Sequence, residues 1–291
     1  MSFEQEFMAN LVVGYQEFMK QTGVNMLLTD GGNMEVEKQV TNVENYISAG
    51  VDGILVQCVS LEALKDTLRQ AIDKGIPVGV YPYDRTANVT TYFGYDEYTW
   101  GYSLGECAAQ WANDHFNGEK IKVLSITSPQ EEASVERSRG WIEACEAGYG
   151  KENIEWVEGA TESALQANPD IKMVLALGDT YGLAAYEALT SSGLDTSDMF
   201  LGACDGTNEA LDLVAANTVF RCDVANDRYV SEIGFYWAQN MVKIILGMDY
   251  DDPFPITTMA VTYDNVNDYR SREPSYVVDQ ALIDFVNSNA Q

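Results

Sequence analysis

Short apolar segments and helical patterns alternate through most of this 291-residue sequence. The segments VNMLLTD (24–30), DGILVQCV (52–59) and IPVGVYPY (76–83) are apolar runs bounded by Gly, Asp or Pro, which is typical of buried strands. The stretches between them, 34–49 and 61–74, carry apolar residues at three- and four-residue spacing, which predicts helices. This βαβ pattern indicates a parallel sheet covered by helices on both faces.

The same alternation starts again near residue 98 and continues to about residue 246. Helical patterns there separate further apolar runs, among them KIKVLSIT (120–127), IKMVLALGD (171–179) and MFLGACDG (199–206). A chain of this length suggests two lobes, each large enough to bury its own core. We therefore predict an α/β protein with two doubly wound parallel-sheet lobes.

Each of the two predicted lobes is formed by two separate segments of the chain. No Gly/Ser/Pro-rich linker separates them, so we expect three strand-like segments to form a hinge. The predicted N-terminal lobe comprises residues 1–95 and 227–253, and the predicted C-terminal lobe comprises residues 96–226 and 254–291.

Composition excludes several classes of function. The 45 acidic and 17 basic side chains give a net charge of −28, which disfavours nucleic acid and anionic membrane surfaces as partners. No apolar stretch approaches the ~18–20 residues of a membrane span, so the given chain is predicted to be soluble. The single histidine, His115, and five cysteines without metal-type spacing argue against a histidine triad and a metal site. We expect no cofactor, no metal and no catalytic residues.

Polar side chains follow the predicted strands. In open α/β sheets, ligands collect beyond the carboxyl ends of the strands. The residues at those ends are Asp30, Asn33, Gln57, Tyr81 to Arg85, Ser128 to Glu132, Asp179, Asp205, Asp223, Asn226 and Asp227. Carboxylates accept hydrogen bonds from hydroxyl groups, and aromatic rings cover C–H faces, so this lining suits a hydroxyl-rich ligand.

Five segments in order resemble one known family. They are AGVDGILVQCVSLEALKDTLRQAIDKGIPVGVY, YDEYTWGYSLGECAAQW, ASVERSRGWIEAC, NPDIKMVLALGDTYGLAAYEAL and FLGACDGTNEAL. They resemble the periplasmic sugar-binding proteins of the ribose and galactose type, the type I solute-binding proteins of ABC transporters, which share their fold with the effector half of LacI-type repressors. The resemblance covers nearly the whole chain.

The resemblance implies a set of ligand-binding residues in both lobes. Asp84 and Arg85 match the family's Asp-Arg pair, although an exposed ion pair is the alternative reading. Tyr81 and Pro82 are extra relative to the family pattern, so contact of Tyr81 or Tyr83 with the ligand in place of Asp84 and Arg85 is a second alternative. The complete candidate set is Gln5, Phe7, Tyr81, Tyr83, Asp84, Arg85, Asp179, Asp205, Asp223 and Asn226.

Some of these candidates have a structural alternative. Phe7 could be core, and Asp205 could cap the following helix. Gly178 stands where the family often has a ligand-binding asparagine, so the role of the neighbouring Asp179 is open. Arg137 matches the arginine that opens a helix in the family.

The resemblance implies an extracytoplasmic binding protein without enzymatic activity. It would close two lobes around a monosaccharide or similar polyol, act as a monomer, and deliver the ligand to an ABC permease for import. Its location would be the periplasm, or the cell surface as a lipoprotein. The alternative is a sensing module of the same fold, coupled to a chemoreceptor or a kinase.

Two departures from the family pattern concern architecture. The family's first strand would stand ahead of SFEQEFMANLVVGYQEF, so we expect residues upstream of the given sequence. The crossover EWVEGATESALQANPD (155–170) leaves only about eight helical residues, which is short for a βαβ unit.

Overall fold

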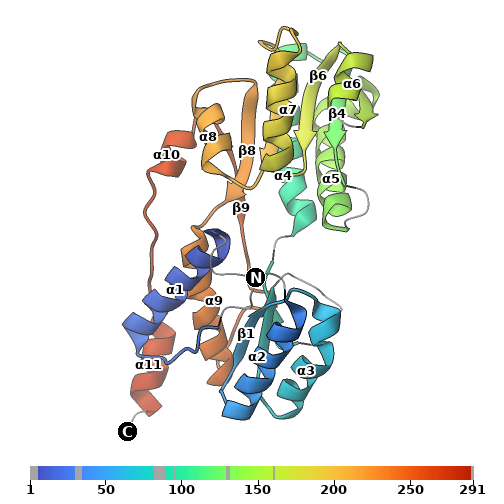
Figure 1. The fold of residues 1–291 in the computed structure, drawn as a ribbon. Coiled ribbons are helices and arrows are strands. Elements are labelled where there is room, and N and C mark those ends of the chain that lie inside the picture. The colour runs from blue at the N-terminus through green and yellow to red at the C-terminus, as the bar shows by residue number, and fades with distance from the viewer. Residues whose placement is uncertain are drawn as a thin grey trace. The chain divides into compact units, whose positions relative to one another are not determined.

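The computed structural model describes residues 6–29, 35–81, 89–94, 96–128, 132–159 and 161–289. The chain divides into two compact units (Figure 1). The N-terminal unit comprises residues 1–95, 228–256 and 273–291, and the C-terminal unit comprises residues 96–227 and 257–272. Both are mixed α/β units built mainly on parallel strands, as predicted.

The N-terminal unit is built on a parallel three-stranded sheet in the order β1-β2-β3. Its strands are β1 (Ile54–Gln57), β2 (Val78–Tyr81) and β3 (Thr91–Tyr92), and its helices are α1 (Glu6–Thr22), α2 (Val36–Ala49), α3 (Leu61–Asp73), α9 (Val230–Ile245) and α11 (Gln280–Asn289). Helices α2 and α3 share one apolar cluster with the strands, while α1, α9 and α11 form a second cluster around Phe18, Phe235 and Leu282. The helices thus form two separate layers, as a doubly wound lobe requires.

The predicted strand at 24–30 is not a strand. Residues 23–29 carry no strand pairing, although their side chains alternate between half-buried and exposed with the period of two that a strand has. A strand is defined by a hydrogen-bonded partner, and within the described residues β1 pairs only with β2. The alternation of burial therefore agrees with the predicted pattern, but the predicted strand pairing does not form within the described residues.

The C-terminal unit has a six-stranded sheet in the order β5-β4-β6-β7-β8-β9. The strands are β4 (Ile121–Ile126), β5 (Ile154–Glu158), β6 (Ile171–Ala176), β7 (Phe200–Cys204), β8 (Phe220–Asn226) and β9 (Thr258–Thr262). The helices are α4 (Glu97–Phe116), α5 (Glu132–Cys145), α6 (Thr161–Ala167), α7 (Asp179–Ser191), α8 (Asn208–Ala215) and α10 (Val266–Arg270). All pairs are parallel except β8 with β9, which is antiparallel.

Helices α4 and α5 pack with their backbones in direct contact. A Cβ atom at Gly101 would lie 1.8 Å from the carbonyl oxygen of Arg137, and one at Gly140 would lie 2.2 Å from that of Tyr98. Only glycine fits at these two positions, because real Cβ contacts are much longer. The contact brings the first turn of α4 next to Arg137 on α5.

The domain boundaries differ from the predicted ones at the C-terminal end of the chain. Residues 273–291 were expected in the C-terminal lobe, but they belong to the N-terminal unit, where Leu282 joins the cluster of α1 and α9. Residues 254–256 also belong to the N-terminal unit. The chain therefore passes between the units at 95/96, 227/228, 256/257 and 272/273, four times instead of the three that were predicted.

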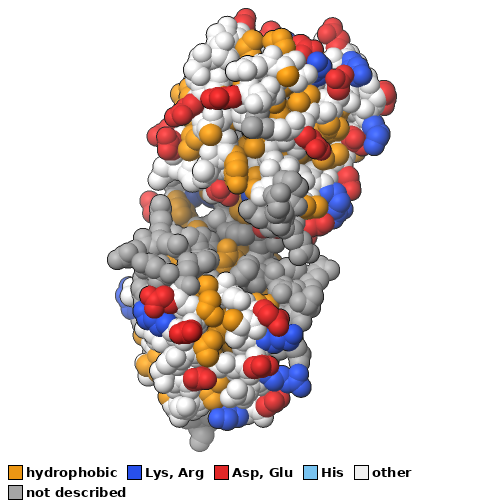
Figure 2. Space-filling view, turned by 45° about the vertical axis from the view of Figure 1, so that its right-hand side comes forward, with side chains coloured by type: hydrophobic (Ala, Val, Ile, Leu, Met, Phe, Trp, Pro, Cys, Tyr) orange, Lys and Arg blue, Asp and Glu red, His pale blue; other side chains and the backbone are white. Residues whose placement is uncertain are grey.

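The charge of the chain is distributed over both units. Figure 2 shows acidic side chains scattered over the visible face of each unit and not gathered into one patch. No helix within the described ranges is both long enough and apolar enough to span a membrane.

Candidate functional site

Asp205 stands at the carboxyl end of β7 with its side chain 44% exposed. Its backbone φ is +122°, a conformation that costs a non-glycine residue about 1–3 kcal/mol and that concentrates at functional sites. Gly206 continues the turn with a φ of +75°. One carboxylate oxygen, Oδ2, accepts a hydrogen bond of 3.1 Å from the backbone N–H of Asp179. The carboxylate is thus fixed on a strained turn and open to solvent.

Gly178 makes room for this carboxylate. A Cβ atom at position 178 would lie 2.6 Å from Oδ2 of Asp205, so a larger residue would push the carboxylate away. The family often has an asparagine at this position. An asparagine at 178 does not fit while the Asp205 carboxylate keeps its present orientation. Gly178 therefore contributes to the site because its lack of a side chain leaves room for the Asp205 carboxylate.

Arg137 and Glu97 form a largely buried ion pair beside Asp205. The guanidinium donates from Nε to Glu97 Oε2 at 2.7 Å and from Nη2 to the same oxygen at 2.5 Å. Its Nη1 donates to the backbone carbonyl of Leu177 and lies 3.9 Å from Oδ1 of Asp205. The guanidinium also lies over the ring of Trp100, 4.2 Å from its centroid. Arg137 is therefore fully engaged by the protein and orients Asp205.

Asp179 and Asp223 hold the turn that follows β7. Asp179 Oδ2 accepts from the N–H of Thr207 at 2.8 Å, and Asp223 Oδ1 accepts from the N–H of Gly206 at 3.2 Å. The two carboxyl groups are also within hydrogen-bonding reach of each other. Both residues are buried. They act on Asp205 through the backbone of its turn.

Burial sets the protonation of these acids. Loss of hydration raises the pKa of Asp179 to about 7 and raises the pKa of Asp223 well above its ordinary value, with mutual repulsion adding to the effect on Asp223. Asp179 Oδ1 and Asp223 Oδ2 have no donor among the described residues, and one proton shared by the two carboxyl groups would supply it. Desolvation likewise raises the pKa of Asp205 and of Glu97, and Arg137 opposes it in both cases.

Asn226 ends β8 and offers an unused acceptor. Its backbone carbonyl accepts from the hydroxyl of Tyr269 at 3.2 Å, which fixes the residue. Its side-chain Oδ1 is buried, and no donor among the described residues reaches it. A buried polar atom of this kind costs free energy unless a partner arrives.

The candidates of the N-terminal unit are described only in part. Tyr81 ends β2, and its ring stacks on Phe93 with centroids 4.6 Å apart and planes 21° apart. Phe93 in turn contacts Trp237, so Tyr81 continues the apolar cluster of this unit. Gln5, Tyr83, Asp84 and Arg85 lie outside the described residues, as does the side chain of Phe7.

The structure thus brings together the predicted residues of the C-terminal unit, Asp179, Asp205, Asp223 and Asn226. Glu97 and Trp100 are not among the residues predicted from the sequence, and Arg137 matched the family pattern without a predicted role in binding. Glu97 and Arg137 are 40 residues apart, so no local pattern connects them. Within the described ranges, no three His, Cys, Asp or Glu residues are arranged to hold a metal ion.

Comparisons with known proteins agree on one family. The family model described as a periplasmic binding protein domain matches residues 2–246. The chain is 30% identical over 216 residues to the ribose import binding protein of Bacillus subtilis (strain 168), covering 70% of this chain and 67% of that protein. It is 25% identical over 229 residues to a putative rhizopine-binding protein of Rhizobium meliloti, covering 74% and 73%.

Solved structures show the same fold. An ABC transporter periplasmic solute-binding protein of Actinobacillus succinogenes 130z with bound D-allose matches with a TM-score of 0.74 at 20% identity, covering 91% of this chain and 96% of that one. A solute-binding protein of Mycobacterium smegmatis with bound glycerol matches with a TM-score of 0.73 at 21% identity, covering 95% and 96%.

Proposed function

The chain belongs to the periplasmic binding protein family, and on this premise we propose that it captures a monosaccharide or similar polyol for import by an ABC transporter. The family binds solutes, and this chain binds its ligand without transforming it. The family also implies an extracytoplasmic location, which we propose to be the periplasm or, for a lipoprotein, the cell surface. The partner is an ABC permease, and the protein acts as a monomer.

Asp205 is the observation that carries this proposal. Its carboxylate is exposed, lies at the carboxyl end of a sheet strand, and is held by the Asp179 N–H and by Arg137. A pre-oriented carboxylate accepts two hydroxyl hydrogen bonds without losing side-chain entropy on binding. Asn226 Oδ1 is a second acceptor in the same unit that awaits a donor. Hydroxyl groups are the donors that both of them fit.

Charge favours a neutral ligand. Arg137 is occupied by Glu97, by Asp205 and by the carbonyl of Leu177, so it has little capacity left to bind an anion. The accessible charge at this site is the Asp205 carboxylate, which repels a second carboxylate or a phosphate. We therefore propose a sugar or polyol, and not a sugar acid or sugar phosphate.

Residues of the N-terminal unit would complete the site when the two lobes close. We propose Gln5, Phe7, Tyr81, Tyr83, Asp84 and Arg85 for this role, from the resemblance of their sequence positions. The ligand would stabilise the closed state by binding both lobes at once, which is the only way in which it can shift the equilibrium.

The test is a thermal-shift screen of the full chain against neutral monosaccharides, polyols, sugar acids and sugar phosphates. A ligand that binds only the folded state raises the melting temperature with the logarithm of its excess over Kd. Each neutral hit is then titrated calorimetrically against the wild type, Asp205→Ala and Asp114→Ala. Asp114 lies near the end of α4 in the same unit, and within the described ranges its carboxylate accepts hydrogen bonds from Gln110 alone, so it controls for the loss of one acidic side chain.

We expect a neutral sugar or polyol to bind, Asp205→Ala to weaken binding by more than about tenfold, which corresponds to about 1.4 kcal/mol, and Asp114→Ala to leave it unchanged. Unchanged binding in Asp205→Ala would overturn the assignment of this residue. Binding of sugar acids or phosphates alone would overturn the proposed ligand class.

A further inference from the structure

Four of the five cysteines of the chain lie in the C-terminal unit. Cys107 is on α4, Cys145 ends α5, Cys204 ends β7 and Cys222 is on β8. All four are free thiols; Cys107 is partly exposed, and the other three are buried. The remaining cysteine, Cys58, is buried in the N-terminal unit. The proposed sugar site uses none of these thiols.

One face of α4 packs along β7 and β8. In the first turn of the helix, the indole of Trp100 donates to the carbonyl of Val224 on β8 at 3.0 Å. One turn later, Leu104 covers Gly202 on β7, where a Cβ atom would lie 2.7 Å from the Leu104 Cδ1. Residues three and four apart share a face of a helix. Cys107 follows Leu104 by three residues, so α4 brings it to the same two strands.

Cys222 faces Cys107 from the sheet. In the register of β7 and β8, Cys222 is the partner of Gly202. Side chains of paired residues on neighbouring strands leave the sheet on the same face, so Cys222 shares with Gly202 the face that α4 covers. The thiols of Cys107 and Cys222 are within hydrogen-bonding reach of each other. Two thiols that are far apart in the sequence therefore meet where the helix contacts the sheet.

The other two thiols of this unit are engaged or placed differently. The thiol of Cys145 donates to the backbone carbonyl of Gly105 at 3.4 Å. Cys204 is paired in the sheet register with a residue two positions beyond Cys222 on β8, so it lies closer to the strand ends that carry the ligand site. Cys107 and Cys222 are therefore the pair that the helix–sheet contact brings together.

We propose that Cys107 and Cys222 are a disulfide site, which closes by exchange with a small-molecule disulfide such as oxidised glutathione and fastens α4 to β8. The partly exposed Cys107 reacts first: its thiolate attacks one sulfur of the small disulfide, and one glutathione thiolate leaves. The Cys222 thiolate then attacks the Cys107 sulfur and releases the second glutathione thiolate. The two protons of the protein thiols pass to these leaving thiolates, so the protein pair is oxidised by two electrons and the small disulfide is reduced.

The location and the chemistry of the pair both support this proposal, which does not depend on the identity of the ligand. Disulfides persist outside the cytoplasm, where the family places its members. The hydrogen bond with Cys107 and burial raise the pKa of Cys222 well above its ordinary value. Because the thiolate is the nucleophile, Cys222 stays inert until Cys107 has reacted and this hydrogen bond is lost. That sets the order of the two steps.

The test uses the full chain, first reduced and then equilibrated with graded ratios of oxidised to reduced glutathione. Remaining thiols are alkylated, linked peptides are identified by mass spectrometry, and the melting temperature is measured with and without reductant. Cys107→Ala and Cys222→Ala each remove one partner. Cys58→Ala is the matched control, because it removes a buried cysteine of the other unit. The peptide map of the wild type needs no variant, so it decides even where a variant fails to fold.

We expect the wild type and Cys58→Ala to yield a peptide pair that links positions 107 and 222. The melting temperature should rise by at least about 5 °C, reversed by reductant, because a cross-link that closes a long loop constrains the unfolded chain. Cys107→Ala should form no bond, and Cys222→Ala should retain one glutathione on Cys107, since the resolving thiol is missing. Absence of the linked peptide at every glutathione ratio would overturn the proposal. So would a bond from Cys107 to Cys145, or from Cys204 to Cys222.

Discussion

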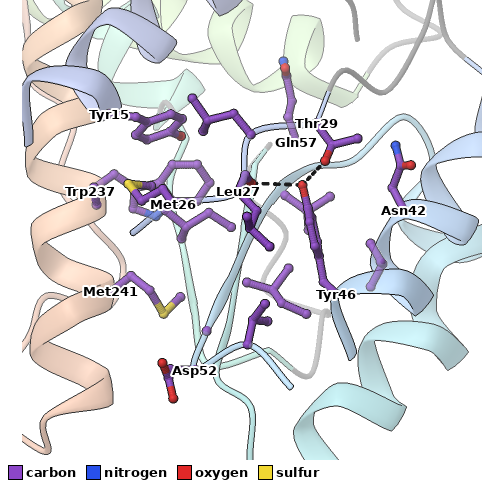
Figure 3. A pocket seen from close by; sticks show the side chains of 18 of the residues that line it. Tyr15, Met26, Leu27, Thr29, Asn42, Tyr46, Asp52, Gln57, Trp237 and Met241 are labelled. Atoms are coloured by element: carbon purple, nitrogen blue, oxygen red, sulfur yellow. Dashed lines mark hydrogen bonds between the residues drawn. The ribbon is translucent and has the colours of Figure 1, made fainter. Parts of the chain in front are cut away.

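The sheets of the two units differ in how completely they are paired, while their helix packing is alike. Each inner strand of the six-stranded C-terminal sheet has neighbours on both sides. In the described part of the N-terminal unit, β1 pairs with one strand and borders an apolar cavity (Figure 3). Both units nevertheless contain a helix pair in backbone contact, through Gly101 and Gly140 in one and through Gly14 and Gly234 in the other.

Helix packing and strand pairing make different contributions to the two units. Close helix contact does not depend on the sheet being complete, because it needs only small residues at the crossing. The positions of the polar groups do depend on the sheet. The carboxylates of the C-terminal unit sit at strand ends and are held by backbone N–H groups that follow β6 and β7. A complete sheet is thus the support on which the site is built.

The largest predicted effect is on the buried ion pair of the C-terminal unit. Arg137→Leu leaves Glu97 buried without its partner and the Leu177 carbonyl without its donor. We expect a loss of about 3 to 5 kcal/mol in the free energy of unfolding, because breaking a buried pair strands a charge. Urea unfolding monitored by hydrogen exchange in each unit measures it.

Arg139→Leu is the matched control for this variant. Arg139 is on the same helix, but its pairs with Glu136 and Glu143 are exposed. We expect a loss of at most about 1 kcal/mol. Equal losses in the two variants would show that the buried pair has no special role.

The second prediction tests the likeness of the two helix pairs. Gly101→Ala and Gly14→Ala each place a Cβ within 2 Å of a carbonyl oxygen, at 1.8 Å from Arg137 and 1.9 Å from Ser231. Each should cost about 2 to 3 kcal/mol by forcing the helices apart. Ser103→Ala on α4 should change stability by less than about 0.5 kcal/mol. Thermal or urea unfolding decides, and tolerance of either alanine would contradict the close packing.

The third prediction is that the stability of the two units depends on pH with opposite sign. Asp179 has a raised pKa of about 7, so the folded state binds a proton that the unfolded state releases near pH 4. Its contribution to stability is present below pH 4 and is lost as pH rises to 7. In the N-terminal unit, Glu17 and Asp279 have lowered pKa values because of hydrogen bonds from Gln21 and Lys243, which gives the opposite sign.

We expect the C-terminal unit to lose about 1 to 2 kcal/mol between pH 5 and pH 8, measured as urea midpoints by unit-resolved hydrogen exchange. Asp223→Asn should flatten this dependence, because an amide donates to Asp179 without titrating. A C-terminal unit that becomes more stable over this range would refute the shared proton.

The smallest predicted effect compares two buried tryptophans. Trp100 donates to Val224, whereas Trp237 lacks an acceptor in the described residues. Replacing each with phenylalanine removes similar volume, but only Trp100→Phe breaks an indole hydrogen bond, and the Val224 carbonyl keeps the N–H of Asp205 as its other donor. We expect it to cost about 1 kcal/mol more than Trp237→Phe. Calorimetric melting measures the difference, and an equal cost would indicate that the Trp237 donor is satisfied.

Local patterns predicted most elements because their causes are local. The alternation predicted to start again near residue 98 does so with α4, which begins at Glu97 and is capped by Asp96 through the N–H of Thr99. The short crossover expected after residue 155 is the seven-residue α6. Turn residues and apolar spacing suffice for such elements.

The features that local sequence patterns did not predict have long-range causes. Segment 24–29 has a strand's alternation, but pairing depends on a neighbour that local pattern cannot supply. The placement of α11 depends on Leu282 finding the cluster of α1 and α9. At the site, the sequence placed Asp179 and Asp223 near strand ends but gave no sign that their carboxyls meet. The pairing of Glu97 with Arg137 depends on glycines at the α4–α5 crossing.

The close contact between Gly178 and the Asp205 carboxylate should couple these two positions in evolution. Because the carboxylate of residue 205 fills the space at 178, a side chain cannot be added at 178 without moving that carboxylate. A descendant that gains a side chain at 178 must first shorten or reorient residue 205. Among relatives of this protein, the pair should therefore change together, and with it the ligand each lineage selects.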